Sequence, residues 1–374
     1  MPGKELTDPC VDCADAEAIL TVRCRRLCQD CYARFVNFKV FKRMENYRLR
    51  RNMSRTGPCK LLLPLSYGTS SSVLLHILNA QIQHERAKSH PSPGFELHVL
   101  VIEPSTVSTS SPPHDEGFDL LQQTFPSHSF TRVSLHNVFE LDPSIQDVLS
   151  QFSSEGFTDD ATMSDKDRLD AFRASITTAT SRVDVDYILI TRLVVAFAKK
   201  IECRGVVWGD SDTRLAAKTL ANVAKGRGSA ITWQVCDGMS PFGLEFSFPL
   251  RDLYKAEVQN YASFFPELAK IIIPDEPPSE NILTKNLSID ELMMRYVQTQ
   301  GEKYPGIMAN VTRTASKLQA SLVPANVPRC SFCGGSMLNQ DGQIIMGGAA
   351  GNSEVRQGAE LCYACTRSRP EVSY

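Results

Sequence analysis

The chain has 374 residues, of which 42% are apolar and 22% charged, a composition typical of a globular protein that divides into more than one unit. It has no run of about 18 apolar residues, which argues against a membrane span. No apolar signal core follows residues 1–5. We therefore expect a cytoplasmic protein whose twelve cysteines are metal ligands or redox groups rather than disulfides.

Cysteine pairs of the form Cys-x-x-Cys lie near both ends of the chain. Their members are Cys10, Cys13, Cys28 and Cys31 in the first set and Cys330, Cys333, Cys362 and Cys365 in the second. Two such pairs can close a tetrahedral site in which each sulfur lies about 2.3 Å from one ion. We expect one structural zinc ion in each set, with iron–sulfur ligation or thiol–disulfide chemistry as alternatives.

The other four cysteines do not form pairs. Cys24 is four residues before Cys28 and could compete as a ligand of the first set. Cys59, Cys203 and Cys236 are isolated, which favours buried small hydrophobes over ligands.

A strongly basic segment follows the first cysteine set. Residues 23–60 include twelve basic and two acidic side chains, a net charge of +10, so the remainder of the chain carries −12. Apolar residues recur at helical spacing, which predicts one amphipathic helix over residues 32–53 with a basic polar face. This asymmetry favours nucleic-acid binding over a merely soluble helix. The expected phosphate contacts are Lys42, Arg43, Arg50 and Arg51.

The next segment predicts a strand over residues 61–65, a turn over residues 66–72 and a helix from Val73. A helix that begins after such a turn can bind phosphate at its N-terminus. The turn is similar to the Ser-Gly-Gly-x-Asp-Ser loop of ATP pyrophosphatases, but Tyr67 replaces the first Gly and Ser70 replaces the Asp.

Nucleotide binding at this turn would use Ser66, Gly68, Ser71 and Ser72. A structural role is favoured, in which residues 70–72 cap the helix, because we expect the Tyr67 ring to project where the backbone should approach phosphate. ATP binding is therefore doubtful. The basic stretch 225–228 could add charge for a phosphate, but a glycine C-cap with basic residues is the favoured interpretation.

Strands and helices alternate through the rest of the central region. The pattern predicts strands over residues 95–102, 129–135, 205–209 and 230–235, with helices over 73–86, 117–124, 167–178, 185–201 and 214–224. Residues 137–166 are polar and are expected to form a flexible insertion. The alternation predicts a parallel sheet with crossover helices. Pro64 stands inside the first strand, near its C-terminal end, and His76 is expected to be a satisfied core residue.

Four motifs, in this order, resemble the cytoplasmic tRNA 2-thiolation protein 2 family over nearly the whole chain. They are the first cysteine set, Leu-Pro-Leu-Ser-Tyr-Gly at 63–68, Gly-Asp with Arg-Leu-Ala-Ala-Lys and Gly-Arg-Gly at 209–228, and the second cysteine set. The resemblance implies an α/β fold, a Rossmann-like ATP-pyrophosphatase-type parallel sheet with helices on both faces. The expected units are a zinc module with the basic helix (1–57), the Rossmann-like domain (58–275), a helical linker (276–327) and a second zinc module (328–374).

The resemblance also implies a function, 2-thiolation of the wobble uridine of tRNA, of the 5-methoxycarbonylmethyl-2-thiouridine type. The implied partners are tRNA, a catalytic adenylating paralogue and a ubiquitin-like sulfur carrier. Active thiolases of this superfamily carry a Gly-His-Asn-x-Asp-Asp turn, whose acidic pair is replaced here by Thr213 and Arg214. The core cysteines of active members are also missing, so no catalytic residue is assigned and a non-catalytic subunit is expected. The alternatives are a divergent ATP-dependent thiolase and a zinc-stabilised adaptor.

Overall fold

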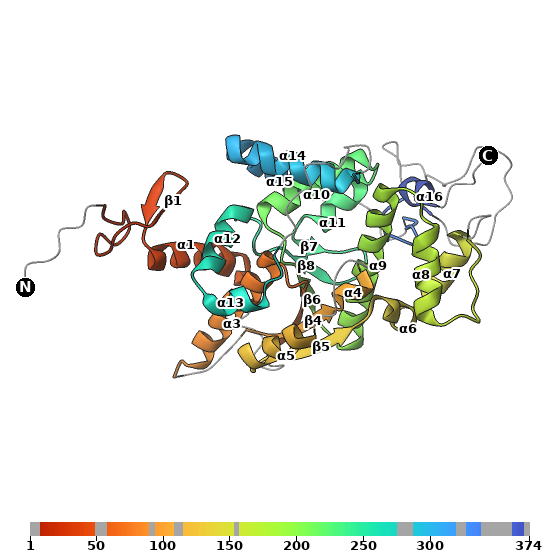
Figure 1. Ribbon diagram of the computed structural model, residues 1–374, viewed down its shortest axis with the longest axis horizontal. Coiled ribbons are helices and arrows are strands. Elements are labelled where there is room, and N and C mark those ends of the chain that lie inside the picture. Colours follow the sequence, from red (N-terminus) through yellow and green to blue (C-terminus); the bar gives the residue numbers. More distant parts are fainter. Residues whose placement is uncertain are drawn as a thin grey trace, which may run out of the picture.

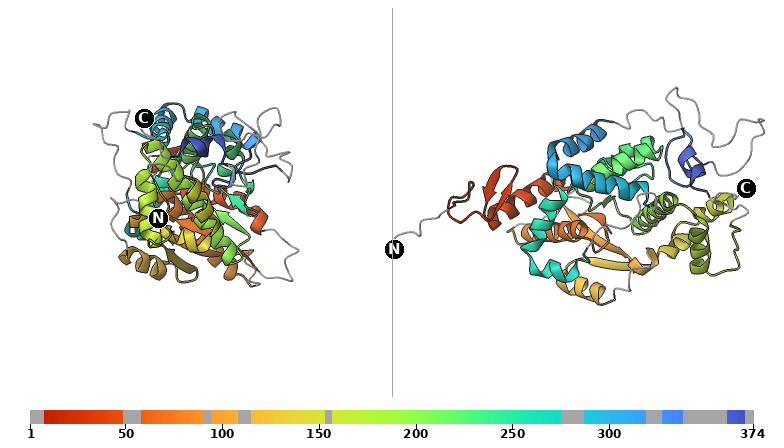
Figure 2. Two further views of the ribbon diagram at one scale, coloured as in Figure 1. Left: turned by 90° about the vertical axis from the view of Figure 1, so that its right-hand side faces the viewer. Right: turned by 45° about the horizontal axis from the view of Figure 1, so that its top comes forward.

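The computed structural model describes residues 8–48, 58–89, 94–107, 115–152, 157–274, 287–318, 327–337 and 361–369. Within them the chain forms a six-stranded sheet and a two-stranded N-terminal sheet. The N-terminal cysteine module and the short helix α16 (Tyr363–Arg367) lie at opposite ends of the longest axis, with the large sheet between them (Figures 1 and 2). No helix in the described part of the chain is long and apolar enough to cross a membrane.

The large sheet has the order β5-β4-β3-β6-β8-β7, and β7 alone among its strands is antiparallel to its neighbour. Its strands are β3 (Cys59–Leu65), β4 (Phe95–Ile102), β5 (Ser129–Val133), β6 (Gly205–Val207), β7 (Gly238–Met239) and β8 (Glu245–Ser247). The chain moves outward from β3 to β5 and then returns to β6 on the other side of β3. The point between β3 and β6 is therefore a topological switch point, where ligands bind in open α/β sheets.

Both faces of the sheet are buried, as the alternation along β3 shows. Leu61, Leu63 and Leu65 pack into one hydrophobic cluster, whereas Leu62 packs into another on the opposite face. Pro64 lies beyond the β3–β6 ladder, which ends at Leu62, so its missing N–H does not interrupt that pairing. The predicted parallel sheet with helices on both faces is confirmed.

Helices cover the sheet and extend beyond its ends. The long ones are α1 (Gln29–Arg43), α3 (Thr69–Arg86), α5 (Asp115–Thr124), α8 (Asp165–Ser175), α9 (Ala179–Lys200), α10 (Asp212–Ala224), α14 (Ile289–Lys303) and α15 (Pro305–Lys317). The shorter ones are α2 (Glu45–Arg48), α4 (Pro104–Val107), η1 (Leu135–Asn137), α6 (Val138–Leu141), α7 (Ser144–Phe152), η2 (Gly228–Ala230), α11 (Ile231–Gln234), α12 (Lys255–Ser263) and α13 (Pro266–Ile271).

The predicted flexible insertion over residues 137–166 is wrong for the residues described. They include α6, α7 and the start of α8, and Phe139, Leu149 and Phe157 are buried in one cluster with α9. A buried ion pair joins Arg168 to Asp159, with the Nε–Oδ1 distance at 2.5 Å. Apolar residues three or four apart bury one face of these helices although the segment is polar on average.

The predicted strand over residues 230–235 is also wrong. These residues form the end of η2 and α11, because Trp233 packs edge-on against Phe242 and Phe246 and this contact overrides the β-branched composition. The neighbour of β6 in the sheet is β8 instead. The single helix predicted over residues 32–53 is interrupted at Met44, where α1 ends, and residues 49–57 lie outside the described ranges.

Candidate functional site

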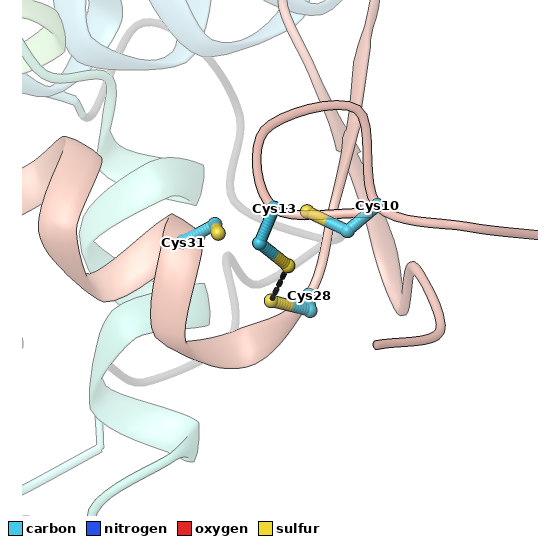
Figure 3. A group of neighbouring side chains, drawn as sticks. All are labelled: Cys10, Cys13, Cys28 and Cys31. Carbon is cyan, nitrogen blue, oxygen red and sulfur yellow. Dashed lines mark hydrogen bonds between the residues drawn. The ribbon is translucent and has the colours of Figure 1, made fainter. Parts of the chain in front are cut away.

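The N-terminal cysteine group joins a loop to the start of a helix. Cys10 and Cys13 lie on a loop closed by the hydrogen bond from the Ala14 N–H to the Cys10 carbonyl, 2.9 Å. Cys28 is the N-cap of α1 and Cys31 lies in its first turn, so both sulfurs face the loop (Figure 3). The hairpin β1 (Leu20–Val22) and β2 (Arg25–Leu27) connects the two halves. All four sulfur atoms lie within 4.8 Å of one another.

The sulfur separations of both groups fit one tetrahedral ion. Metal–sulfur bonds of about 2.3 Å place tetrahedral sulfurs about 3.8 Å apart. The Cys13–Cys28 Sγ distance is 3.8 Å and the Cys333–Cys362 Sγ distance is 3.7 Å. A four-iron cluster places iron and sulfide between its cysteines and needs them farther apart than these groups allow. Both predicted sets are therefore assembled, each with room for a single ion.

Cys24 takes no part in the N-terminal group. It occupies the two-residue turn between β1 and β2 together with Arg23, where both residues have positive φ values of +68° and +47°. Two left-handed residues in succession make the turn that a tight hairpin requires, and they leave the Cys24 side chain exposed. Its possible competition with Cys28 is not realised in this arrangement.

The C-terminal group is held by a similar loop and a short helix. Gly334 has a φ of +71°, and its N–H donates to the Cys330 carbonyl at 2.9 Å. Cys362 is the N-cap of α16. Hydrogen bonds from the neighbouring thiols of Cys333, Cys362 and Cys365 lower the pKa of Cys330, which favours a thiolate at the centre of the group.

A buried arginine contacts this group from the end of α10. Both Nη atoms of Arg227 lie 3.4 Å from the Cys365 sulfur, and Arg227 Nε donates to the Asp184 carboxylate of α9 at 2.8 Å. The Arg227 side chain is only 3% exposed. Asp184 also accepts from the Ser368 hydroxyl, which follows α16, at 3.4 Å.

Sequence analysis did not identify this role of Arg227, because its ion partner is 43 residues away and its sulfur partner 138. The neighbouring residues agree with the favoured structural interpretation of the 225–228 stretch. Gly226 has a φ of +74° after the end of α10, and Lys225 is paired with Asp184 and Asp290 at 3.1 and 2.9 Å.

The loop between β3 and α3 is largely closed on itself. The helix begins at Thr69 with Gly68 as its N-cap, so Ser70–Ser72 lie inside the first turn and do not cap it as expected. The Ser71 hydroxyl donates to the Gly68 carbonyl at 3.1 Å and lies 3.3 Å from the Ser66 hydroxyl. Ser71 and Ser72 are buried, whereas Ser66 is exposed.

Tyr67 keeps the backbone conformation of a glycine. Its φ is +57°, a left-handed value that is an outlier for a bulky residue. Its ring is 1% exposed and belongs to the main hydrophobic cluster. The expectation that the ring projects into the turn is wrong, because the positive φ directs it into the core.

The loop after β6 meets this turn. A Cβ on Gly209 would lie 2.7 Å from the Ser71 Cα, so the two loops touch and only glycine fits there. Asp210 is paired with Lys218 at 2.6 Å. Thr213 accepts from the Lys255 N–H at 3.0 Å, at the start of α12, and the Arg214 side chain is 57% exposed.

The predicted phosphate contacts differ in their surroundings. Lys42 is exposed at the end of α1. Arg43 makes a two-point ion pair with Asp252, with distances of 2.7 and 2.9 Å. Arg50 and Arg51 lie outside the described residues.

The isolated cysteines are buried, as predicted, and His76 is a partly buried residue with hydrogen-bonding partners. Burial raises the pKa of the Cys59 and Cys203 thiols to about 11 and also raises that of Cys236. Burial lowers the pKa of His76, whose Nδ1 lies 3.3 Å from the Tyr261 hydroxyl. No reactive thiolate is expected at the three cysteines.

The strand order, the strand–loop–helix at the switch point and the two cysteine groups define an α/β protein with a mostly parallel six-stranded sheet and two four-cysteine groups that could each hold a metal ion. Its fold is similar to that of the U34-tRNA thiolase NcsA from Methanococcus maripaludis, solved with its [4Fe-4S] cluster. The TM-score is 0.56 at 14% identity, over 89% of this chain and 94% of that one.

Relatives by sequence define the family. The family description cytoplasmic tRNA 2-thiolation protein 2 matches residues 288–345, which include α14 and α15. Proteins of that name from Neosartorya fischeri and Aspergillus oryzae are 80% and 64% identical over 373 residues, with all of each chain covered. The chain belongs to the cytoplasmic tRNA 2-thiolation protein 2 family, as its motifs predicted, and the family name agrees with the predicted cytoplasmic location.

Proposed function

We propose that this chain is a non-catalytic subunit of the cytosolic complex that 2-thiolates the wobble uridine of tRNA. Family membership supports the reaction. The observation that carries the non-catalytic role is the closed switch point, where the Ser71 hydroxyl is used within its own loop and Asp210 is neutralised by Lys218. Catalysis by adenylation needs charged groups placed where the transition state develops charge. In the described loops at this point, the carboxylate of Asp210 already lies against Lys218 and Arg214.

A reconstituted reaction tests this proposal. It would contain the catalytic paralogue, the ubiquitin-like sulfur carrier, ATP and tRNA, with thiolation followed by mass spectrometry of the nucleosides. Omission of this chain should abolish thiolation, whereas Ser66→Ala with Ser71→Ala should leave it largely intact. Pyrophosphate release by this chain alone, or a large loss of turnover in the assembled double variant, would instead favour a divergent thiolase.

The proposed metal is zinc in both cysteine groups. The tetrahedral sulfur spacing supports a single ion, and four thiolates with no open position are typical of structural zinc. When bound, the ion would hold each loop against its helix. Elemental analysis of the purified chain should find two zinc ions per molecule, and iron in their place would contradict the assignment.

The proposed tRNA contact is the basic surface at the end of α1. The exposed Lys42 supports it, and the sequence adds Arg50 and Arg51 outside the described residues. Arg43 is already paired with Asp252. Changing Lys42, Arg50 and Arg51 to Glu should weaken tRNA binding and flatten its salt dependence, because phosphate contacts release counterions. Lys166→Glu is the control, since Lys166 is exposed and belongs to α8, which lies at the other end of the molecule from α1 (Figure 1). Unchanged affinity and salt slope in the triple variant would contradict the contact.

A further inference from the structure

A small basic pocket lies beside the N-terminal module, at the carboxyl ends of β6 and β8. It has a volume of about 70 Å³ and is bordered by α1, the starts of α10 and α12, and α15. A water molecule needs only about 10–15 Å³ of such volume, so the pocket accommodates a larger group. Its charged lining includes the cations Arg23, Lys39, Arg43, Arg251 and Arg313. We call it the Asp212 pocket after its most buried acidic residue.

Three of these cations already have carboxylate partners. Arg23 pairs with Glu257 at 2.8 Å, Arg43 with Asp252 at 2.7 Å and Arg251 with Asp237 at 3.0 Å. Lys39 and Arg313 have no ion pair to a carboxylate in the part of the chain that the structure describes. The pocket therefore offers two positive charges to an anion.

Asp212 gives the pocket a second and different recognition group. The residue is 3% exposed, and its Oδ1 accepts a hydrogen bond from the Thr312 hydroxyl at 2.6 Å. Its Oδ2 is buried and has no hydrogen-bond partner among the described residues. Buried polar atoms are nearly always hydrogen-bonded. We therefore expect a bound group to donate a hydrogen bond to this oxygen.

A ligand for this pocket must present a hydrogen-bond donor close to an anion. The ribose-phosphate backbone of RNA does so, because its 2′-hydroxyl donates beside the phosphate, and DNA lacks that hydroxyl. We infer that the Asp212 pocket binds one ribose-phosphate unit of an RNA strand. Asp212 Oδ2 accepts from the 2′-hydroxyl, and Lys39 and Arg313 contact the phosphate. This inference rests on the proposed binding of tRNA.

Single-atom changes in the RNA test the pocket directly. Full-length tRNA and versions that each carry one 2′-deoxy substitution would be titrated against the intact chain. At the bound nucleotide the deoxy version should bind roughly tenfold more weakly, which is the effect of one hydrogen bond to a charged group. In Asp212→Asn that position should lose its effect. Asp186→Asn is the matched control, since its carboxylate pairs with Arg173 and neither residue lines the pocket, so the deoxy effect should remain.

If Asp212→Asn does not fold, a second variant still tests the pocket. Arg313 is exposed, so Arg313→Gln should fold, weaken all the tRNA versions alike and reduce the salt slope by about one. Binding of tRNA with no deoxy effect in the wild type, or an unchanged slope in Arg313→Gln, overturns the pocket alone. Absence of any tRNA binding by the wild type overturns the proposed function as well.

Discussion

The two four-cysteine groups have the same ligands and the same sulfur spacing, but their surroundings differ. At the N-terminal group, the guanidinium that reaches a sulfur belongs to the exposed Arg34, whose Nη2 lies 3.0 Å from Cys31. At the C-terminal group it belongs to the buried Arg227, which also pairs with Asp184 of α9. The cation beside the N-terminal sulfurs faces solvent, whereas the cation beside the C-terminal sulfurs lies in the core.

This difference shows how a four-cysteine group can be joined to the protein core through a buried ion pair. Four thiolates around a divalent ion leave two negative charges, and buried charge is costly unless it is paired. Arg227 supplies one compensating charge to the C-terminal group, and its other partner, the Asp184 carboxylate, also pairs with Lys225. The C-terminal cysteine group, α9 and the end of α10 are therefore linked through Arg227. At the N-terminal group, Arg34 contacts Cys31 and has no ion pair to a carboxylate among the described residues.

Of the changes that test this difference between the two groups, loss of a cysteine ligand should have the largest effect on stability. Cys365→Ser should remove one ion and unfold the region around α9, because structural zinc contributes about 10–16 kcal/mol and a whole domain about 5–15 kcal/mol. Cys13→Ser should remove the other ion and unfold the N-terminal module with less damage to the core. Metal content and urea unfolding measure both, and Cys24→Ser, at an exposed position, should behave as wild type. Equal losses from the two ligand variants would contradict the distinction.

Replacement of the two arginines separates the groups without touching a ligand. Arg227→Met should cost about 3–5 kcal/mol, because it leaves Asp184 and the thiolates buried with one compensating charge fewer. Arg34→Met should leave the free energy of unfolding unchanged, since Arg34 is exposed. Chemical denaturation at neutral pH compares the two variants. A similar loss in both would show that solvent does not screen the N-terminal group.

The pH dependence of stability shows what an unpaired buried charge costs, because Asp212 is a buried carboxyl with no ion pair among the described residues. Burial raises its pKa from 3.8 to about 6. The folded state therefore binds more protons than the unfolded state between these values, and stability falls as pH rises from about 4 to 6, by about 3 kcal/mol. Asp212→Asn should lack this fall, so its stability relative to wild type should increase over that range. A constant difference between pH 4 and pH 7 would contradict the assignment.

The smallest expected effect is at the turn that carries Arg227. Gly226→Ala should cost about 1–2 kcal/mol, because the φ of +74° is unfavourable for a side chain while the space around it is adequate. Gly228→Ala is the matched control, with no positive φ and no atom within 4 Å of its added Cβ. Thermal unfolding resolves a difference of this size. Equal melting temperatures for the two variants would show that the turn is not strained by a side chain.

Local spacing made much of the fold predictable. The cysteine pairs, the parallel sheet and the strand over residues 95–102 depend on neighbours in the sequence, and the structure reproduces them. The sequence did not predict the helix over residues 231–234, because Trp233 packs against Phe242 and Phe246 from a later segment.

The site was harder to predict for the same reason. The sequence predicted Arg43 as a phosphate contact, but Arg43 is paired with Asp252, which is 209 residues away. Asp212 gave no signal beside the altered turn at 213–214, because its burial depends on Thr312 of α15. The spacing of residues indicates which side chains can act together locally. The spacing does not indicate which charged side chains form ion pairs with residues far away in the sequence.

The exposed turn between β1 and β2 has a practical consequence. Of the twelve cysteines only Cys24 is exposed, and it adjoins Arg23, which lines the Asp212 pocket. A maleimide dye should therefore label the metal-loaded wild type at a single position without any engineered cysteine. Its fluorescence would then follow the docking of an RNA strand beside the hairpin in real time.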